Sequence, residues 1–108
     1  MTVYVDDMRA PYGRMIMCHM IADTEAELHA MADRVGVARR WHHRGHYNIC
    51  LERRARAVAA GAHEITKRQA AAMMAQRRAG GRLPPPACAE LLFRLAKRAR
   101  RAQEGEAA

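Results

Sequence analysis

Two acids and a histidine near the start of the chain are the first residues whose types and spacing suggest chemistry. Asp6 and Asp7 end the apolar run TVYVDD, and a carboxylate at the carboxyl end of a strand is where α/β folds often place metal ligands or catalytic groups. His19 lies inside an apolar run, with Asp23 four residues later. We expect His19 to act as a metal ligand or general base and Asp23 as its orienting partner or a second ligand. The structural alternatives are that the acids cap a turn and a helix, and that His19 is a hydrogen-bonded core residue.

Further candidate ligands crowd residues 41–47, which read WHHRGHY. Three histidines in five positions are able to bind a transition metal. His42 and His43 are adjacent, however, so their side chains diverge on most backbones, and no further Cys or His completes a zinc spacing. His46 is therefore the candidate from this group. The sequence predicts one acid–base or divalent-metal centre, made of Asp6, His19, Asp23 and His46.

One geometric expectation opposes a shared site. If residues 15–21 form a continuous strand that runs antiparallel to the first after a short loop, His19 lies roughly 15 Å from Asp6, at ~3.3 Å per residue. A site that contains both residues then requires this strand to break early or to be helical.

The charge distribution indicates an anionic partner. The net charge is +8, and residues 67–108 carry ten Lys and Arg against three Glu, which is +7. Such an excess of positive charge steers anionic partners toward a protein. For a substrate of this kind, the predicted anion-binding residues are Arg14, Arg39 and Arg40. Cations beside aromatic rings also suit single-stranded nucleic acid, and for this alternative the predicted contacts are Trp41, Arg44, Tyr47, Arg94, Lys97, Arg98 and Arg101.

Composition and motifs exclude several other classes. The longest apolar runs are far shorter than the ~18–20 residues of a membrane span, and the first residues carry no basic region typical of a secretory signal. Three scattered cysteines do not make a disulfide framework, so we expect a cytoplasmic protein. The sequence has no phosphate-binding glycine loop, nucleophile elbow or H-E-x-x-H motif.

Strands that alternate with helices must position these residues. Strands are predicted at residues 2–6, 15–21 and 62–65, with loops at 7–13 and 37–48. The short apolar run at 15–21 also fits a helix. Helices are predicted from Thr24 to Gly36, over 51–60 and from Thr66 to Ala79, because Thr24 and Thr66 begin capping-box patterns. We therefore expect an α/β fold. It is a small two- or three-layer domain with a short sheet of three or four strands and three helices, plus a C-terminal amphipathic helix.

The chain divides into a core domain at residues 1–81, a Pro-rich linker at 82–86, a basic amphipathic helix at 87–102 and a disordered tail at 103–108. Three successive prolines make the linker stiff. The helix carries an apolar stripe that is too extensive to face water on a monomer. We expect it to form a homodimer contact, because the core should already be closed without it. The stripe consists of Cys88, Leu91, Leu92, Leu95 and Ala99.

Several short motifs occur in a specific order over residues 2–75. They are VYVDD, G-R-x-x-x-x-H-M-x-A-D, T-x-x-E-L, G-V-A-R-R, H-Y-N-I and A-x-x-x-G-A. In this order the chain resembles a small bacterial and phage family catalogued as domain of unknown function 4031. The resemblance implies no activity, but it implies recurring polar positions at Asp6, His19, Asp23, His46 and Tyr47. Asn48 stands where the family usually has Asp, which weakens any proposal that needs a carboxylate there.

Two functions follow from these observations. The first is a metal-assisted hydrolase that acts on a phosphate ester or another anionic substrate. The alternative is a non-catalytic, nucleic-acid-associated accessory protein that binds through its basic C-terminal half. Positive charge favours anionic partners in both cases. What separates the two is whether the predicted site residues converge.

Overall fold

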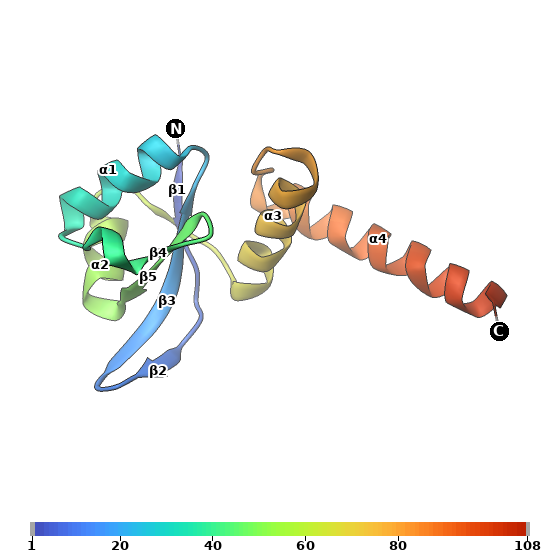
Figure 1. The fold of residues 1–108 in the computed structure, drawn as a ribbon, viewed down its shortest axis with the longest axis horizontal. Coiled ribbons are helices and arrows are strands. Elements are labelled where there is room, and N and C mark those ends of the chain that lie inside the picture. Colours follow the sequence, from blue (N-terminus) through green and yellow to red (C-terminus); the bar gives the residue numbers. More distant parts are fainter. Residues whose placement is uncertain (1, 108) are drawn as a thin grey trace.

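The computed structural model describes residues 2–107, with side chains through Gly105. In this part of the chain, six strands and four α-helices form an α/β fold, as the sequence predicted (Figure 1). The strands are β1 (Val3–Val5), β2 (Ala10–Tyr12), β3 (Met15–Ala22), β4 (His42–His43), β5 (His46–Cys50) and β6 (His63–Glu64). The helices are α1 (Glu25–Val35), α2 (Leu51–Ala59), α3 (Lys67–Gly80) and α4 (Pro86–Ala107), with a 3-10 turn η1 (Arg39–Trp41).

All six strands belong to one mixed sheet. The order is β4–β5–β3–β1–β6, and β2 pairs with the first half of β3. Every pairing is antiparallel except that of β1 with β6. The sheet has more strands than the three or four predicted, because β2, β4 and the start of β5 lie in segments that were predicted to be loops. These segments are short, and they become strands only by pairing with a neighbour.

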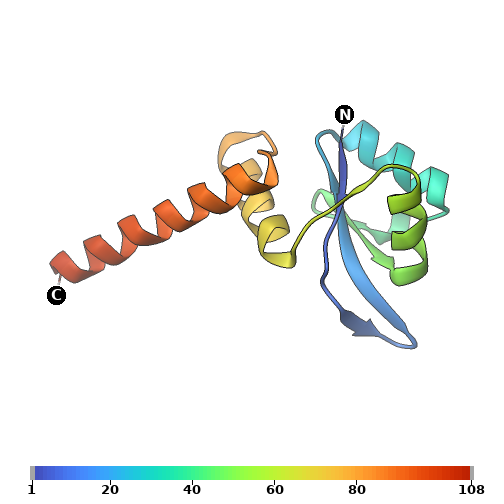
Figure 2. The same ribbon diagram turned by 180° about the vertical axis from the view of Figure 1, so that it is seen from behind.

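Helices cover both faces of the sheet, as Figures 1 and 2 show from opposite sides. Successive residues of a strand point to opposite faces, so β3 contributes to two cores. Cys18, Met20 and Ala22 pack in the core beneath α1 and α2. Ile21 packs with Tyr4 in a smaller core beneath α3. The buried Val, Ile and Met residues of β1 and β3 therefore form the centre of the domain.

Local capping signals determine the helix boundaries. Thr24 is the N-cap of α1 and its hydroxyl accepts a hydrogen bond from the backbone N–H of Glu27, while Gly36 ends the helix in the left-handed conformation at φ 80°. Thr66 and Gln69 form the complete predicted capping box at the start of α3. The predicted helix starts at Thr24 and Thr66 are both confirmed.

Helix α4 contacts the domain only at its beginning. Its first turn packs against α3, and Ala89 is fully buried there. Beyond this turn α4 projects away from the sheet (Figures 1 and 2). The helix continues through residues 103–107, which the sequence predicted to be disordered. None of the helices within residues 2–107 is long and apolar enough to cross a lipid bilayer.

Candidate functional site

The pairing of β1 with β3 brings Asp6 next to His19. Val5 lies opposite Met20, and the backbone N–H of Asp6 donates to the carbonyl oxygen of His19 at 3.0 Å. The expected separation of roughly 15 Å was wrong, although β3 is indeed one continuous antiparallel strand. The chain does not turn back directly after Asp6. It first forms β2, which pairs with the first half of β3, and the tight turn between β2 and β3 lies at Gly13, where φ is 59°.

The carboxylate of Asp6 is fully buried and receives three N–H contacts. Its Oδ1 accepts hydrogen bonds from the backbone N–H of His19 at 2.8 Å and of Met8 at 3.3 Å. Its Oδ2 lies 2.7 Å from Nδ1 of His19, whose side chain is 27% exposed. The backbone contacts fix the carboxylate, the carboxylate orients the imidazole, and Nε2 of His19 is left for a second partner.

Asp7 has a different environment from its neighbour. Its Oδ1 accepts a hydrogen bond of 2.6 Å from the backbone N–H of Lys67, at the N-terminus of α3. An acid at this position satisfies a free helix N–H group and interacts favourably with the helix dipole. Of the two adjacent acids, Asp7 therefore has the structural capping role, and Asp6 faces the histidines.

His46 joins this pair from β5. Its ring centroid lies 5.0 Å from that of His19 with the planes at 86°, and His43 is 5.9 Å away on the other side. Burial, followed by the nearby His19, His43 and His42 rings, lowers the pKa of His46 to about 4. Nδ1 of His46 is buried and has no hydrogen-bond partner within the described part of the chain. His46 is thus a neutral imidazole at pH 7, with one ring nitrogen unsatisfied.

The sheet separates this histidine cluster from the neighbouring cysteine. Cys18 precedes His19 on β3, so its side chain points to the opposite face and is fully buried there. Burial, together with the Asp6 carboxylate, raises the pKa of the Cys18 thiol to about 12. A protonated, buried thiol does not serve as a nucleophile. The reactive groups on this face are therefore the imidazoles and the Asp6 carboxylate.

An apolar cleft lies beside Asn48, next to His19 in the sheet. Asn48 is the cross-strand neighbour of His19 and forms part of the cleft wall. The cleft has a volume of about 180 Å³. Its remaining lining residues come from the β1–β2 loop, β2, β3 and η1: Met8, Ala10, Pro11, Tyr12, Met17 and Trp41. Tyr12 and Trp41 meet edge to face with ring centroids 5.6 Å apart, so the cleft offers aromatic surface to an apolar group.

Asp23 does not join the cluster. Its backbone N–H donates to the carbonyl oxygen of Thr2, at the opposite end of β1 from Asp6. Its side chain is exposed, and Oδ1 lies 3.5 Å from the hydroxyl of Tyr4. The structure therefore brings together three of the four predicted residues, and Asp23 is the exception, because His19 and Asp23 are separated along one extended strand.

The predicted anion-binding arginines do not converge on His19. Arg14 lies in the β2–β3 turn, five residues before His19, or about 16 Å along an extended strand. Arg39 pairs with Asp33 at 3.6 Å, with both side chains largely exposed, and Arg40 lies over the ring of Trp41 at 5.5 Å.

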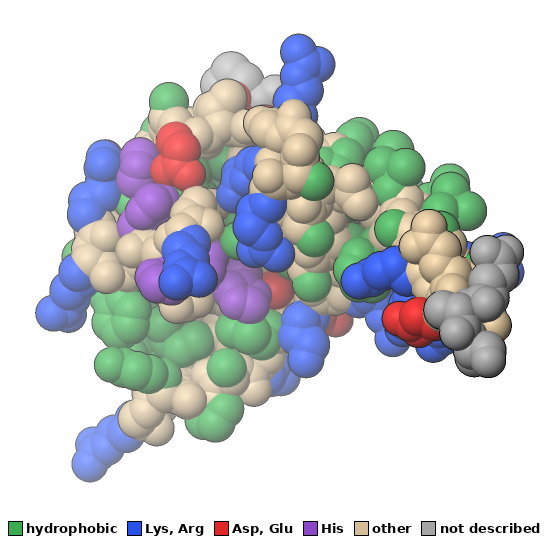
Figure 3. Space-filling model, turned by 45° about the vertical axis from the view of Figure 1, so that its right-hand side comes forward, with side chains coloured by type: hydrophobic (Ala, Val, Ile, Leu, Met, Phe, Trp, Pro, Cys, Tyr) green, Lys and Arg blue, Asp and Glu red, His purple; other side chains and the backbone are tan. Residues whose placement is uncertain are grey.

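Two other arginines lie nearer to the cluster. Arg54 donates from Nε to the carbonyl oxygen of Asp6 at 2.8 Å, and Arg77 donates to that of Gly45, beside His46, at 2.8 Å. They come from α2 and α3, so no local sequence signal pointed to them. In Figure 3 the histidines gather on one face, beside apolar side chains and among Lys and Arg side chains.

The residues predicted to bind nucleic acid are also dispersed. Tyr47 is 0% exposed and its ring packs in the main core, so it presents no open face for base stacking in this structure. Trp41 is half-buried against Tyr12, and Arg44 is exposed in the β4–β5 turn with φ 49°. The basic residues of α4 lie on its projecting part and are exposed: Arg94, Lys97, Arg98 and Arg101.

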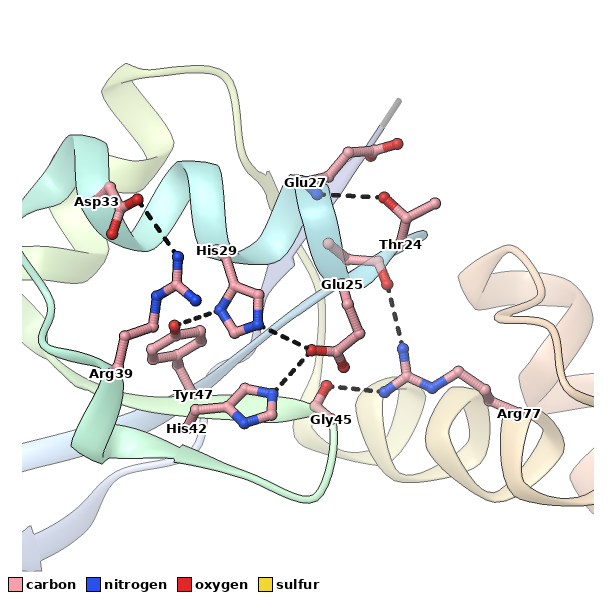
Figure 4. Close-up of polar contacts among 11 residues, drawn as sticks. Thr24, Glu25, Glu27, His29, Asp33, Arg39, His42, Gly45, Tyr47 and Arg77 are labelled. Carbon is pink, nitrogen blue, oxygen red and sulfur yellow. Dashed lines mark hydrogen bonds and ion pairs between the residues drawn. The ribbon is translucent and has the colours of Figure 1, made fainter.

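A second cluster, which was not predicted from the sequence, lies on the other face of the sheet. Its members are Glu25, His29 and His42, with Tyr47 behind them (Figure 4). Each of the three offers one ligand atom, and these atoms all lie within 4.8 Å of one another. Within the described residues, this is the group whose donor spacing fits one metal ion. The spacing of Glu25 and His29, one helical turn apart, was the signal that could have revealed half of it.

Comparison with known protein families identifies the family of this chain. The family described as "Protein of unknown function (DUF4031)" matches residues 3–77, and the chain belongs to it. The match covers β1 to most of α3, including both histidine clusters, and ends before α4. No curated protein matches the chain, and no solved structure does.

Proposed function

We propose that this member of a family without an assigned activity is a hydrolase that acts on a phosphate ester or another anionic substrate, with its centre at Asp6, His19 and His46. The observation that carries the proposal is the 2.7 Å contact between the buried Asp6 carboxylate and Nδ1 of His19. A buried carboxylate that orients an exposed imidazole is the arrangement by which proteins prepare a histidine for general base catalysis.

Each residue has a distinct role in the proposed reaction. Asp6 holds the proton on Nδ1 of His19, so the lone pair of Nε2 is available to take a proton from water. The water oxygen forms the new bond to phosphorus, and the bond to the leaving oxygen breaks. That oxygen receives a proton from the His19 imidazolium. Asp6 stabilises the imidazolium while it exists, because the carboxylate is negatively charged.

His46 complements His19 because it stays neutral. Its lowered pKa of about 4 means that it does not add a second positive charge 5.0 Å from the His19 ring. A neutral imidazole is still able to donate an N–H hydrogen bond to negative charge that develops on the substrate. Arg44 and Arg77 supply positive charge at the β4–β5 turn beside His46, which favours an anionic substrate.

Direct metal binding by the predicted set is less well supported than acid–base catalysis. The Asp6 carboxylate already accepts three N–H contacts, and Asp23 lies at the other end of β1. We therefore assign Asp6 an orienting role toward His19 instead of a ligand role.

Hydrolysis of bis(p-nitrophenyl) phosphate and p-nitrophenyl phosphate tests the proposal, because both release a coloured product and carry a flat apolar group suited to the cleft. We expect His19→Ala to lower the rate by about 10²–10⁴-fold, the usual contribution of a general base. His63→Ala is the control, because His63 is exposed on β6 and its ring centroid lies 6.1 Å from that of Tyr4. Among the described residues no hydrogen bond joins His63 to Asp6 or His19. A folded His19→Ala variant that retains the wild-type rate would refute the assignment.

A specific observation favours nucleic-acid binding as a second candidate function. Arg94, Lys97, Arg98 and Arg101 recur at positions i, i+3, i+4 and i+7 of α4, so they share one helix face, and with two leucines they line a groove of about 350 Å³. Such a stripe suits the phosphate backbone of nucleic acid. Each Lys or Arg that contacts a phosphate contributes about 0.9 to the slope of log K against log salt on duplex DNA. Removing all four side chains should therefore reduce the magnitude of this slope by about 3–4. A variant with these four residues changed to Ala is compared with Arg56→Ala on α2, and an equal slope in both excludes α4 as the contact.

We further propose that α4 mediates self-association. We also propose a cytoplasmic location. The projecting part of α4 leaves four large apolar side chains exposed, at Leu91, Leu92, Phe93 and Leu95. This is more apolar surface than a helix in water normally presents, and a second copy of the same helix would cover it. The cysteines at 18, 50 and 88 are all free, which agrees with a reducing compartment.

A further inference from the structure

We propose that Glu25, His29 and His42 form a binding site for a divalent transition-metal ion, such as Zn²⁺, on the face of the sheet opposite the Asp6–His19 pair. Two imidazole nitrogens and one carboxylate oxygen are a ligand set that such ions use. The proposal is independent of the hydrolase proposal, because it rests on different residues and a different face.

Two elements, α1 and β4, carry the ligands. Glu25 and His29 are four residues apart at the start of α1, so their side chains lie on one side of the helix. His42 comes from β4 and is opposite Tyr47 in the antiparallel pairing with β5, which turns it toward α1. His43, the next residue, points to the other face beside His46. Adjacent histidines thus contribute to different clusters, because residues alternate along a strand.

The distances fit one ion at the meeting point of these side chains. In the structure, Nε2 of His42 lies 2.9 Å and Nε2 of His29 lies 3.3 Å from the same oxygen, Oε2 of Glu25 (Figure 4). Tetrahedral zinc ligands at bond lengths of about 2.0–2.2 Å lie about 3.4 Å from one another. The two imidazole nitrogens are therefore close to the required distance from the Glu25 oxygen, and all three donor atoms lie within 4.8 Å of one another. Small side-chain movements allow an ion to replace the N–H···O contacts.

Tyr47 orients the His29 ring from behind. Its buried hydroxyl lies 2.6 Å from Nδ1 of His29, which directs Nε2 toward Glu25. When Nε2 binds a metal, the proton moves to Nδ1, which then donates to the Tyr47 oxygen. A hydroxyl both donates and accepts, so it satisfies His29 with or without an ion. This partner on the remote nitrogen is typical of histidine ligands.

The site is accessible from solvent. The side chains of His29 and His42 are 25% and 28% exposed, and that of Glu25 is 52% exposed. Three protein ligands at a partly open position leave a fourth position for water or another small ligand. The β4–β5 turn is held at this edge by Arg77, which donates to the carbonyl oxygens of Ala22 and Gly45 (Figure 4). The arrangement of the strand that carries His42 is thus fixed by α3.

Cobalt titration tests the site directly. The full chain is purified without a polyhistidine tag, treated with a chelator, and titrated with Co²⁺, whose visible absorption reports low-coordinate nitrogen and oxygen ligation. We expect one equivalent of Co²⁺ to bind and Zn²⁺ to displace it. No absorption change at millimolar Co²⁺ would overturn the proposal.

Variants identify which histidines bind. His42→Ala and Glu25→Gln should each weaken Co²⁺ binding at least about 100-fold, and Tyr47→Phe about 10–100-fold, the usual effect of losing an outer hydrogen bond. His43→Ala is the matched control: it removes the neighbouring imidazole from the other face and should leave binding unchanged. Loss of binding in His43→Ala, or wild-type binding in a His42→Ala variant, would overturn the assignment. Glu25→Gln preserves side-chain shape, and thermal melting in chelator verifies that each variant is folded.

Discussion

Replacement of Asp6 by Asn should reverse the tautomer of His19 while preserving the fold. In the wild-type protein the Asp6 carboxylate only accepts hydrogen bonds, so it requires a proton on Nδ1 of His19. The Asn oxygen is able to keep the two backbone contacts from His19 and Met8. The Asn nitrogen must then face Nδ1 as a donor, and the His19 proton must move to Nε2. A general base with its proton on Nε2 has no lone pair to offer to water.

The expected loss of stability follows from the same contacts. Asp6→Asn removes one charge-assisted hydrogen bond, of about 1.5–3 kcal/mol, but it also removes the cost of burying a carboxylate. We therefore expect the free energy of unfolding to fall by about 1–2 kcal/mol. Asp6→Ala also leaves two buried backbone N–H groups without an acceptor, each at a cost of about 1–3 kcal/mol, so its loss should be about 2–5 kcal/mol.

Two measurements check this prediction. Proton–nitrogen correlation spectra of the imidazole rings distinguish Nδ1–H from Nε2–H at pH 7.5, and urea unfolding gives the free energies. We expect Nδ1–H in the wild type and Nε2–H in Asp6→Asn. We also expect the hydrolysis rate of Asp6→Asn to fall as far as that of His19→Ala. If His19 already carries its proton on Nε2 in the wild type, the orienting role of Asp6 is refuted.

The remaining predictions concern pH and oligomeric state. The pKa of His46 falls from 6.5 to about 4 on folding, so the unfolded chain binds more protons between these values and stability falls as the pH drops from about 7 to 4. The pKa shift corresponds to at most about 3 kcal/mol of unfolding free energy, and solvent screening at this half-buried ring reduces it to about 1–2 kcal/mol. The unfolding free energy of His46→Gln, measured in urea, should therefore depend less on pH than that of the wild type. Leu92→Asp with Leu95→Asp should abolish a dimer in sedimentation without lowering the melting temperature of the core, because both side chains are exposed; a monomer before and after the changes would exclude self-association through α4.

Local sequence patterns were sufficient to predict most of the regular elements. Thr24 and Gly36 mark the ends of α1, and the Thr66–Gln69 capping box marks the start of α3, because caps depend on residues within one turn. The apolar run of β1 was equally clear, whereas the run that forms β3 also fitted a helix, because so short a run does not distinguish the two. Short strands such as β2 and β4 were missed, since a two- or three-residue strand carries too little pattern and exists only through its partner.

The sequence also determined which residue types were available for chemistry, but not which of them meet. Asp6 and His19 converge because the hairpin turn is at Gly13, and this register is a property of strand pairing that spacing alone left open. The same alternation of side chains that places Cys18 in the core directs His42 and His43 to opposite faces.

Only the tertiary structure separated Asp23 from the Asp6–His19 pair, buried Tyr47 in the core, and revealed Glu25 with His29 and His42 as a second cluster. These outcomes depend on contacts between elements that are distant in the chain. A local pattern reports what a segment prefers, whereas the pairing of β3 with β1 and β5, and the packing of α1 on the sheet, decide which side chains share a site.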